Sequence, residues 1–125
     1  MSTVTAVDHL SVYAEGWANA DPERILEAAS PGFVFDDPNA GRIQRADFAS
    51  YLEATREAVE TLRTSASSTT WMEIGEVVTK EEDGVLTAWC WWAIPGTGVE
   101  GSGLIKVGAE GVVSERIAYY TALPA

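Results

Sequence analysis

Cysteine and histidine are almost absent from this sequence of 125 residues, which contains one of each, Cys90 and His9. A single cysteine excludes a disulfide within the chain, which fits a reducing compartment, so we expect a cytoplasmic protein. A zinc site would need carboxylates for most of its ligands, because the usual thiolate and imidazole ligands are missing. We therefore expect no metal. We interpret His9 as a half-exposed side chain, with a place at a pocket mouth as the alternative.

Positive charge is also scarce. The chain has eight Lys and Arg residues and 19 Asp and Glu residues, which gives a net charge of −11. A strongly acidic chain repels phosphate groups, so nucleic acid and anionic membrane surfaces are poor partners. No apolar run is long enough to cross a membrane, and the first residues lack the basic and apolar regions of a signal peptide.

Two short motifs of known chemistry can be set aside. Residues 96–101, GTGVEG, have the spacing of a dinucleotide-binding loop, but they lie between two expected strands instead of opening a helix. A nucleophile elbow would need glycines two residues either side of Ser102, where Glu100 and Leu104 stand. We therefore expect no cofactor.

Helical patterns occupy the first half of the chain. Apolar residues recur at three- and four-residue steps over residues 5–19, and Asp21 with Pro22 predicts a second, short helix that ends at 30–32. Residues 33–37 are typical of a strand, residues 38–41 of a loop, and residues 45–63 of a third helix.

Strand-like runs fill the second half. They cover residues 69–79, 85–94, 99–107 and 112–121, and short turn sequences separate them, which favours antiparallel hairpins. Helices followed by strands predict an α+β fold with one domain over residues 1–125. The run WCWW, residues 89–92, is apolar on both faces of its strand. A second copy is the simplest cover for the outer face, so we expect a homodimer through the sheet, with a large apolar patch on a monomer as the alternative.

The run FVFDD, residues 33–37, ends in two carboxylates with different expected surroundings. Side chains alternate along a strand, so Asp37 shares a face with Phe33 and Phe35, whereas Asp36 points the other way. A carboxylate among aromatic rings is desolvated, a setting typical of proton-transferring groups. Alternatively, Asp37 caps the turn that follows, because Asp-Pro-Asn is turn chemistry.

Tyr13 lies within the apolar stripe of the first helix, and its hydroxyl group needs a partner when buried. A buried tyrosine and a buried aspartate form a common polar pair in an apolar pocket, so we expect Tyr13 beside Asp37. The alternative is a core tyrosine whose hydroxyl reaches the surface.

The segments YAEGWANADPERILEAASPGFVFDDP (13–38) and GAEGVVSERIAYYT (108–121) resemble the nuclear-transport-factor-2-like superfamily, in particular its SnoaL-like polyketide cyclase and ketosteroid isomerase branch. The resemblance implies a cone-shaped, cystatin-like fold. In it, three N-terminal helices pack on a strongly curved, mostly antiparallel sheet around an apolar pocket, and most members dimerise.

Carried over by position, the resemblance makes Asp37 the proton-shuttling aspartate and Tyr13 the oxyanion-binding tyrosine of an isomerase. The second oxyanion donor of those enzymes falls at Gly103, which offers no side-chain donor; protonated Glu100 or Glu115 is the alternative. Thr121 stands where many relatives carry an acid.

The resulting hypothesis is a cofactor-independent isomerase or cyclase that acts on a small hydrophobic carbonyl compound. The catalytic residues would be Asp37 and Tyr13. Non-catalytic ligand binding and a dimeric scaffold are the alternatives, and five tryptophans favour a filled or narrowed pocket. The residues expected to contact the substrate are Trp17, Phe33, Phe35, Tyr51, Trp92, Glu115 and Tyr119.

Overall fold

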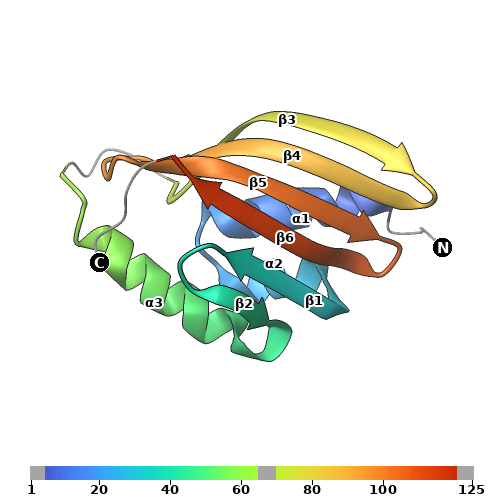
Figure 1. Ribbon diagram of the computed structural model, residues 1–125, viewed down its shortest axis with the longest axis horizontal. Helices are drawn as coiled ribbons and strands as arrows, with labels where there is room; N and C mark the ends of the chain where they lie inside the picture. Colours follow the sequence, from blue (N-terminus) through green and yellow to red (C-terminus); the bar gives the residue numbers. More distant parts are fainter. Residues whose placement is uncertain (1–4, 65–69, 121–125) are drawn as a thin grey trace.

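Three helices pack on one face of a curved six-stranded sheet in the computed structural model (Figure 1), which describes residues 5–64 and 70–120. The helices are α1 (Ala6–Ala18), α2 (Pro22–Ala28) and α3 (Phe48–Glu60). The strands are β1 (Ala29–Asp37), β2 (Gly41–Gln44), β3 (Glu73–Glu82), β4 (Val85–Ile94), β5 (Val99–Gly108) and β6 (Gly111–Tyr119). The α+β prediction is therefore confirmed.

The sheet has the strand order β2-β1-β6-β5-β4-β3. Strands β3 to β6 form a meander of hairpins, as their short connections predict. Strand β1 joins the edge of this meander by pairing with β6 in parallel, the one parallel pair among the described strands. The sheet is mostly antiparallel, and its first and last strands are neighbours.

Helix starts follow the capping signals of the sequence. Thr5 and Asp8 form a reciprocal capping box at α1, and Asp21 accepts a hydrogen bond from the backbone of Arg24 at the start of α2. None of the described helices is long and apolar enough to cross a membrane.

Several predicted boundaries were wrong around β1. Helix α2 ends at Ala28, and residues 30–32 belong to β1, which has nine residues instead of five. The loop expected over residues 38–41 is shorter by one residue, because a further strand, β2, begins at Gly41. Strand β2 pairs antiparallel with β1. The third helix is shorter than expected, because residues 45–47 form a 3-10 turn and α3 ends at Glu60. A short edge strand of mixed polarity carries too weak a pattern to be found from sequence.

The first strand of the meander is also displaced from its predicted range. Strand β3 runs from Glu73 to Glu82, and the predicted start at Thr69 lies outside the described residues, as does Thr121. The charged residues 80–82 pair with β4, so the turn consists of Asp83 and Gly84 alone. Both have positive φ, 53° and 77°, which suits a two-residue hairpin.

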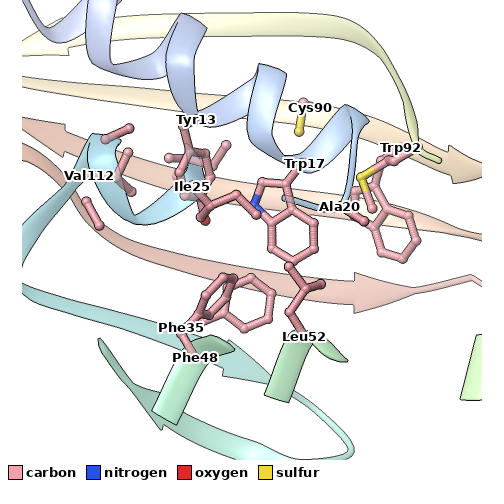
Figure 2. Close-up of a cluster of buried hydrophobic side chains, with 14 of the residues drawn as sticks. Tyr13, Trp17, Ala20, Ile25, Phe35, Phe48, Leu52, Cys90, Trp92 and Val112 are labelled. Atoms are coloured by element: carbon pink, nitrogen blue, oxygen red, sulfur yellow. The ribbon is translucent and has the colours of Figure 1, made fainter. Parts of the chain in front are cut away.

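The core lies between the helices and the inner face of the sheet, where Phe35, Phe48 and Leu52 pack against Trp17 (Figure 2). The WCWW run divides between the two faces. Cys90 and Trp92 are buried inside, whereas Trp89 and Trp91 are 37% and 40% exposed on the outer face.

Candidate active site

A cavity of about 280 Å³ lies between α1, α3 and the inner face of the sheet. Its wall is almost entirely apolar, and Glu115 is its only carboxylate among the described residues. The cavity is open space, so the tryptophans do not fill it. Most of the predicted site residues line it: Tyr13, Trp17, Phe35, Tyr51, Trp92, Glu115 and Tyr119.

Phe33, by contrast, was predicted to contact the substrate and does not line the cavity. Its ring is buried and packs edge-on against Tyr13 and Phe48, with ring centroids 6.0 Å and 5.5 Å away. Phe33 therefore packs against the Tyr13 ring without reaching the cavity. His9 is half-buried, away from the cavity wall, and a ring nitrogen lies 3.3 Å from the backbone oxygen of Ala109.

Asp37 is buried, 5% exposed, on the same side of β1 as Phe33 and Phe35, as the alternation predicts. It does not line the main cavity. It lies in a neighbouring groove of about 410 Å³ beside α3. Asp36, on the other face, pairs with Arg42 at 2.9 Å, and this hydrogen bond lowers the pKa of Asp36.

Both oxygens of Asp37 already accept hydrogen bonds. Its Oδ1 accepts from the backbone nitrogens of Asn39 (2.7 Å) and Ala40 (3.3 Å), so the turn-capping interpretation is correct. Its Oδ2 accepts from the hydroxyls of Tyr51 (2.5 Å) and Tyr119 (2.9 Å). Asp37 therefore ties two strands and α3 together through one carboxylate.

Tyr51 and Tyr119 line both the main cavity and the neighbouring groove, so their rings separate the two spaces. Burial, first of all, raises the pKa of each hydroxyl well above its ordinary value, and the Asp37 carboxylate adds to the effect. Both tyrosines thus stay protonated and keep donating to Asp37.

Tyr13 pairs with Glu115 instead of the expected Asp37. The Tyr13 hydroxyl donates a short hydrogen bond to Oε1 of Glu115. Burial raises the pKa of the Glu115 carboxyl to about 7, and raises that of the Tyr13 hydroxyl further above its ordinary value. The cavity thus contains a carboxyl group that changes protonation near neutral pH, beside a hydroxyl that does not.

No family model and no curated protein matches this chain. Solved structures match along almost its whole length. An "NTF2-like protein of unknown function" from Cytophaga hutchinsonii has a TM-score of 0.64 at 12% identity, over 94% of this chain and 92% of the other. A "protein of unknown function with cystatin-like fold" from Methylobium petroleophilum also has a TM-score of 0.64, at 19% identity, over 99% and 81%. This chain has the nuclear-transport-factor-2-like fold.

The nuclear-transport-factor-2-like fold confirms the cystatin-like architecture that the sequence resemblance implies. A further structure with this fold, a "putative polyketide cyclase" from Xanthomonas campestris, has a TM-score of 0.59 at 16% identity, over 94% of this chain and 90% of the other. At these identities the likeness is one of fold, so the chemistry must be argued from the cavity itself.

The position of Gly103 explains how this chain departs from the isomerase pattern that its sequence resembles. A Cβ atom at Gly103 on β5 would lie 2.2 Å from Oε2 of Glu115, so the Glu115 carboxyl occupies the space that a side chain at Gly103 would need. An acidic side chain is thus present at this place, but it comes from β6, whereas the resemblance would place one on β5. The register of β5 and β6 places Glu115 opposite Ile105, two residues from Gly103 on β5, and so brings its carboxyl group close to Gly103.

Among the described residues, no group of three or more His, Cys, Asp or Glu side chains could hold a metal ion. Cys90 lines the cavity near Glu115, and burial raises the pKa of its thiol to about 12, so it stays protonated. The carboxyl and hydroxyl groups that line the cavity are therefore those of Glu115, Tyr13, Tyr51, Tyr119, Ser11 and Thr55.

Proposed function

We propose that this chain is a cofactor-independent enzyme of the isomerase or cyclase type, which moves a proton on a small hydrophobic carbonyl compound. The proposal assigns the proton transfer to Glu115 instead of Asp37. The observation that carries it is a carboxyl group in an apolar cavity whose pKa, about 7, suits both taking and returning a proton at neutral pH. The cavity volume, near the lower end of the usual range of roughly 300–1,000 Å³, fits a small ligand.

In the proposed reaction, ionised Glu115 removes a proton from the carbon next to the substrate carbonyl. The C–H bond breaks, an O–H bond forms on Glu115, and the electron pair moves to the carbonyl oxygen as an enolate. The Tyr13 hydroxyl, which donates to Glu115 in the free protein, can then donate to the enolate oxygen, because the negative charge has moved there. Return of the proton to another carbon completes an isomerisation.

Asp37 fits this role less well. Its two oxygens accept four hydrogen bonds, and Tyr51 and Tyr119 stand between it and the main cavity. A substrate proton would have to displace one of these donors. Asp37-mediated transfer is therefore the competing version of the same chemistry.

A second candidate is ligand binding without turnover. It is favoured by the way the two carboxyl groups are already paired, Glu115 with Tyr13 and Asp37 with Tyr51. Such a protein would bind the same class of compound and leave it unchanged.

Exchange of substrate protons with D2O tests these candidates directly. Cyclohex-3-enone, a small ketone with acidic α-protons and a movable double bond, would be followed by proton NMR for exchange and for conjugation. We expect the wild-type protein to accelerate exchange, and Glu115→Gln to reduce the acceleration by about 10²-fold or more. Glu110→Gln, at an exposed turn, controls for the loss of one negative charge.

The possible outcomes distinguish proton transfer by Glu115 from transfer by Asp37 and from binding without turnover. Retained exchange in Glu115→Gln together with loss in a folded Asp37→Asn would assign the transfer to Asp37. No acceleration by wild-type protein, with binding seen by NMR line broadening, would favour the binding protein.

We also propose that the outer face of the sheet pairs with a second copy of the chain. Val78, Trp89 and Leu104 lie side by side across β3, β4 and β5, and all three are exposed. The ring of Trp91 packs at a tilt against that of Tyr120 beside this row, with ring centroids 4.8 Å apart. Exposed apolar side chains gathered in this way are typical of an interface, and a two-fold axis would bring the same patch of each copy together.

A further inference from the structure

The main cavity opens to solvent on one side. Among the described residues that line it, three are exposed, Val7 (61%), Val77 (50%) and Ser11, whereas the others are buried or half-buried. A side chain that faces both the cavity and solvent lies at the rim of an opening. Val7 and Ser11 belong to α1, and Val77 belongs to β3, the edge strand of the sheet (Figure 1). The opening between α1 and β3 is called the mouth below.

The α1 side of the mouth leads inward along one face of the helix. Val7 and Ser11 are one turn apart, so they lie next to each other at the rim. Leu10, also one turn from Val7, is half-buried, and Tyr13 is buried, and both line the cavity. The helical wall of the cavity therefore passes from solvent at Val7 to the Tyr13–Glu115 pair inside.

A β-bulge turns Val77 toward the mouth. The register between β3 and β4 shifts after Gly75 and is regular again from Val78, so Glu76 and Val77 form the bulge. Glu76 has a φ of 48°, which residues other than glycine rarely adopt. In a regular strand, residues three apart face opposite sides of the sheet, yet Ile74 and Val77 both line the cavity. The bulge therefore brings Val77 to the inner face, at the rim.

The carboxyl group of Glu115 lies two strands away from the mouth. The bulge of β3 is level with Cys90 on β4, which pairs with Gly103 on β5. Oε2 of Glu115 lies over Gly103, 2.2 Å from the place that a Cβ atom would take there. Two strand spacings of about 4.8 Å separate β3 from β5, so the path from the rim to the carboxyl group is about 10 Å long.

The mouth is narrow, because α1 and β3 approach each other to within 8 Å between Cα atoms. A single alkyl chain passes through such a gap more easily than a ring system. We propose that the ligand of this cavity is an acyl compound with an unbranched alkyl tail, whose carbonyl group lies at the Tyr13–Glu115 pair and whose tail leads out through the mouth. Val7 and Val77 then determine which tails are accepted. The place of the carbonyl group rests on the proposed function, whereas the mouth does not depend on turnover.

A series of methyl ketones, from 2-pentanone to 2-dodecanone, measures the length of tail that the cavity encloses. Binding to ¹⁵N-labelled wild-type protein would be followed by chemical-shift changes in NMR titrations. We expect the affinity to rise about fourfold for each methylene group that is buried. An extended alkyl chain advances about 1.3 Å per carbon, since its C–C bonds of about 1.5 Å zigzag. The rise should therefore stop near 2-decanone, whose tail spans about 10 Å, the length of the path to the rim.

Val77→Asp places a charge at the mouth and leaves the interior of the cavity unchanged. We expect it to weaken binding of 2-decanone about tenfold, because the end of the tail loses its apolar contact at the rim. Binding of 2-pentanone, which stays inside, should remain within about twofold of wild type. Val7→Asp should have the same effect from the α1 side, and it replaces Val77→Asp if that variant does not fold. Val113→Asp, at an exposed position of β6 outside the cavity wall, is the matched control and should leave both affinities unchanged.

A limit near 2-decanone, together with the selective loss in the rim variants, would support the proposal. It would be overturned by an affinity that still rises at 2-dodecanone, by rim variants that weaken both ketones equally or neither, or by no binding of any ketone at millimolar concentration. Only binding is measured, so the two proposals fail separately: absence of proton exchange contradicts the proposed function alone, and absence of a limit on tail length contradicts this proposal alone.

Discussion

The raised pKa of Glu115 makes a quantitative prediction about stability. The carboxyl titrates near 7 in the folded protein, against an ordinary value of 4.5. Because the folded pKa is raised, the folded state binds the extra proton between these values, and stability falls as the pH rises through this window. The difference between 4.5 and about 7 corresponds to about 3 kcal/mol in total, of which about 2 kcal/mol falls between pH 5.5 and 8.5.

Glu115→Gln is the perturbation that isolates this effect, because glutamine keeps the shape and cannot ionise. Nineteen acidic residues contribute to the pH dependence of the wild type, so the quantity to follow is the difference between the two proteins. We expect the free energy of unfolding of the variant, relative to that of the wild type, to increase by about 2 kcal/mol as the pH rises from 5.5 to 8.5.

Urea denaturation, followed by far-ultraviolet circular dichroism at half-unit steps of pH, measures this difference. Glu110→Gln, at an exposed turn, controls for removing a charge from an acidic chain. A wild-type-minus-variant difference that stays constant within about 0.5 kcal/mol over this range would refute the reasoning, because it would mean that Glu115 ionises as it does in water.

Three further substitutions or measurements follow from the same contacts. Gly103→Ala should displace the Glu115 carboxyl from Tyr13 and lower the free energy of unfolding by about 1–3 kcal/mol, measured by urea denaturation. The loss should be smaller in a Glu115→Ala background, and an equal loss in both backgrounds would contradict this explanation. Asp37→Asn should lower the free energy of unfolding by about 1–3 kcal/mol, because the charged acceptor of two tyrosine hydroxyls is lost; a neutral effect would show that these bonds are weak in solution. Sedimentation at micromolar concentration should give twice the monomer mass, and Trp91→Glu should halve it, whereas a monomeric wild type would exclude the proposed dimer.

The local features of this fold could be predicted from the sequence. Alternation along FVFDD placed Asp37 on the buried face and Asp36 on the other, and helical spacing placed Tyr13 in the core. These inferences use neighbours in the chain, where the geometry of a helix or strand fixes the direction of each side chain.

The partners of those residues could not be predicted in the same way. The Tyr13–Glu115 hydrogen bond joins residues 102 positions apart, and the Asp37–Tyr119 bond joins residues 82 apart. Both depend on the register of β6 against its neighbours, which no local pattern encodes. Glu115 itself was expected to contact the substrate, but its pairing with Tyr13 was not predicted.

The parallel pairing of β1 with β6 also has a consequence for the order of folding. Strands β3 to β6 are successive hairpins and can form from contacts close in sequence, whereas β1 pairs with β6 across about eighty residues, with Phe35 opposite Glu115. We expect this β1–β6 pairing, called the seam below, to form late in folding, after the β3–β6 meander on which β1 docks. Glu115, to which we assign the proposed proton transfer, lies on the seam itself, so the cavity is complete only after the two halves of the chain have met. A ligand that binds there would hold the seam closed and protect the amide protons of β1 from exchange before those of β4.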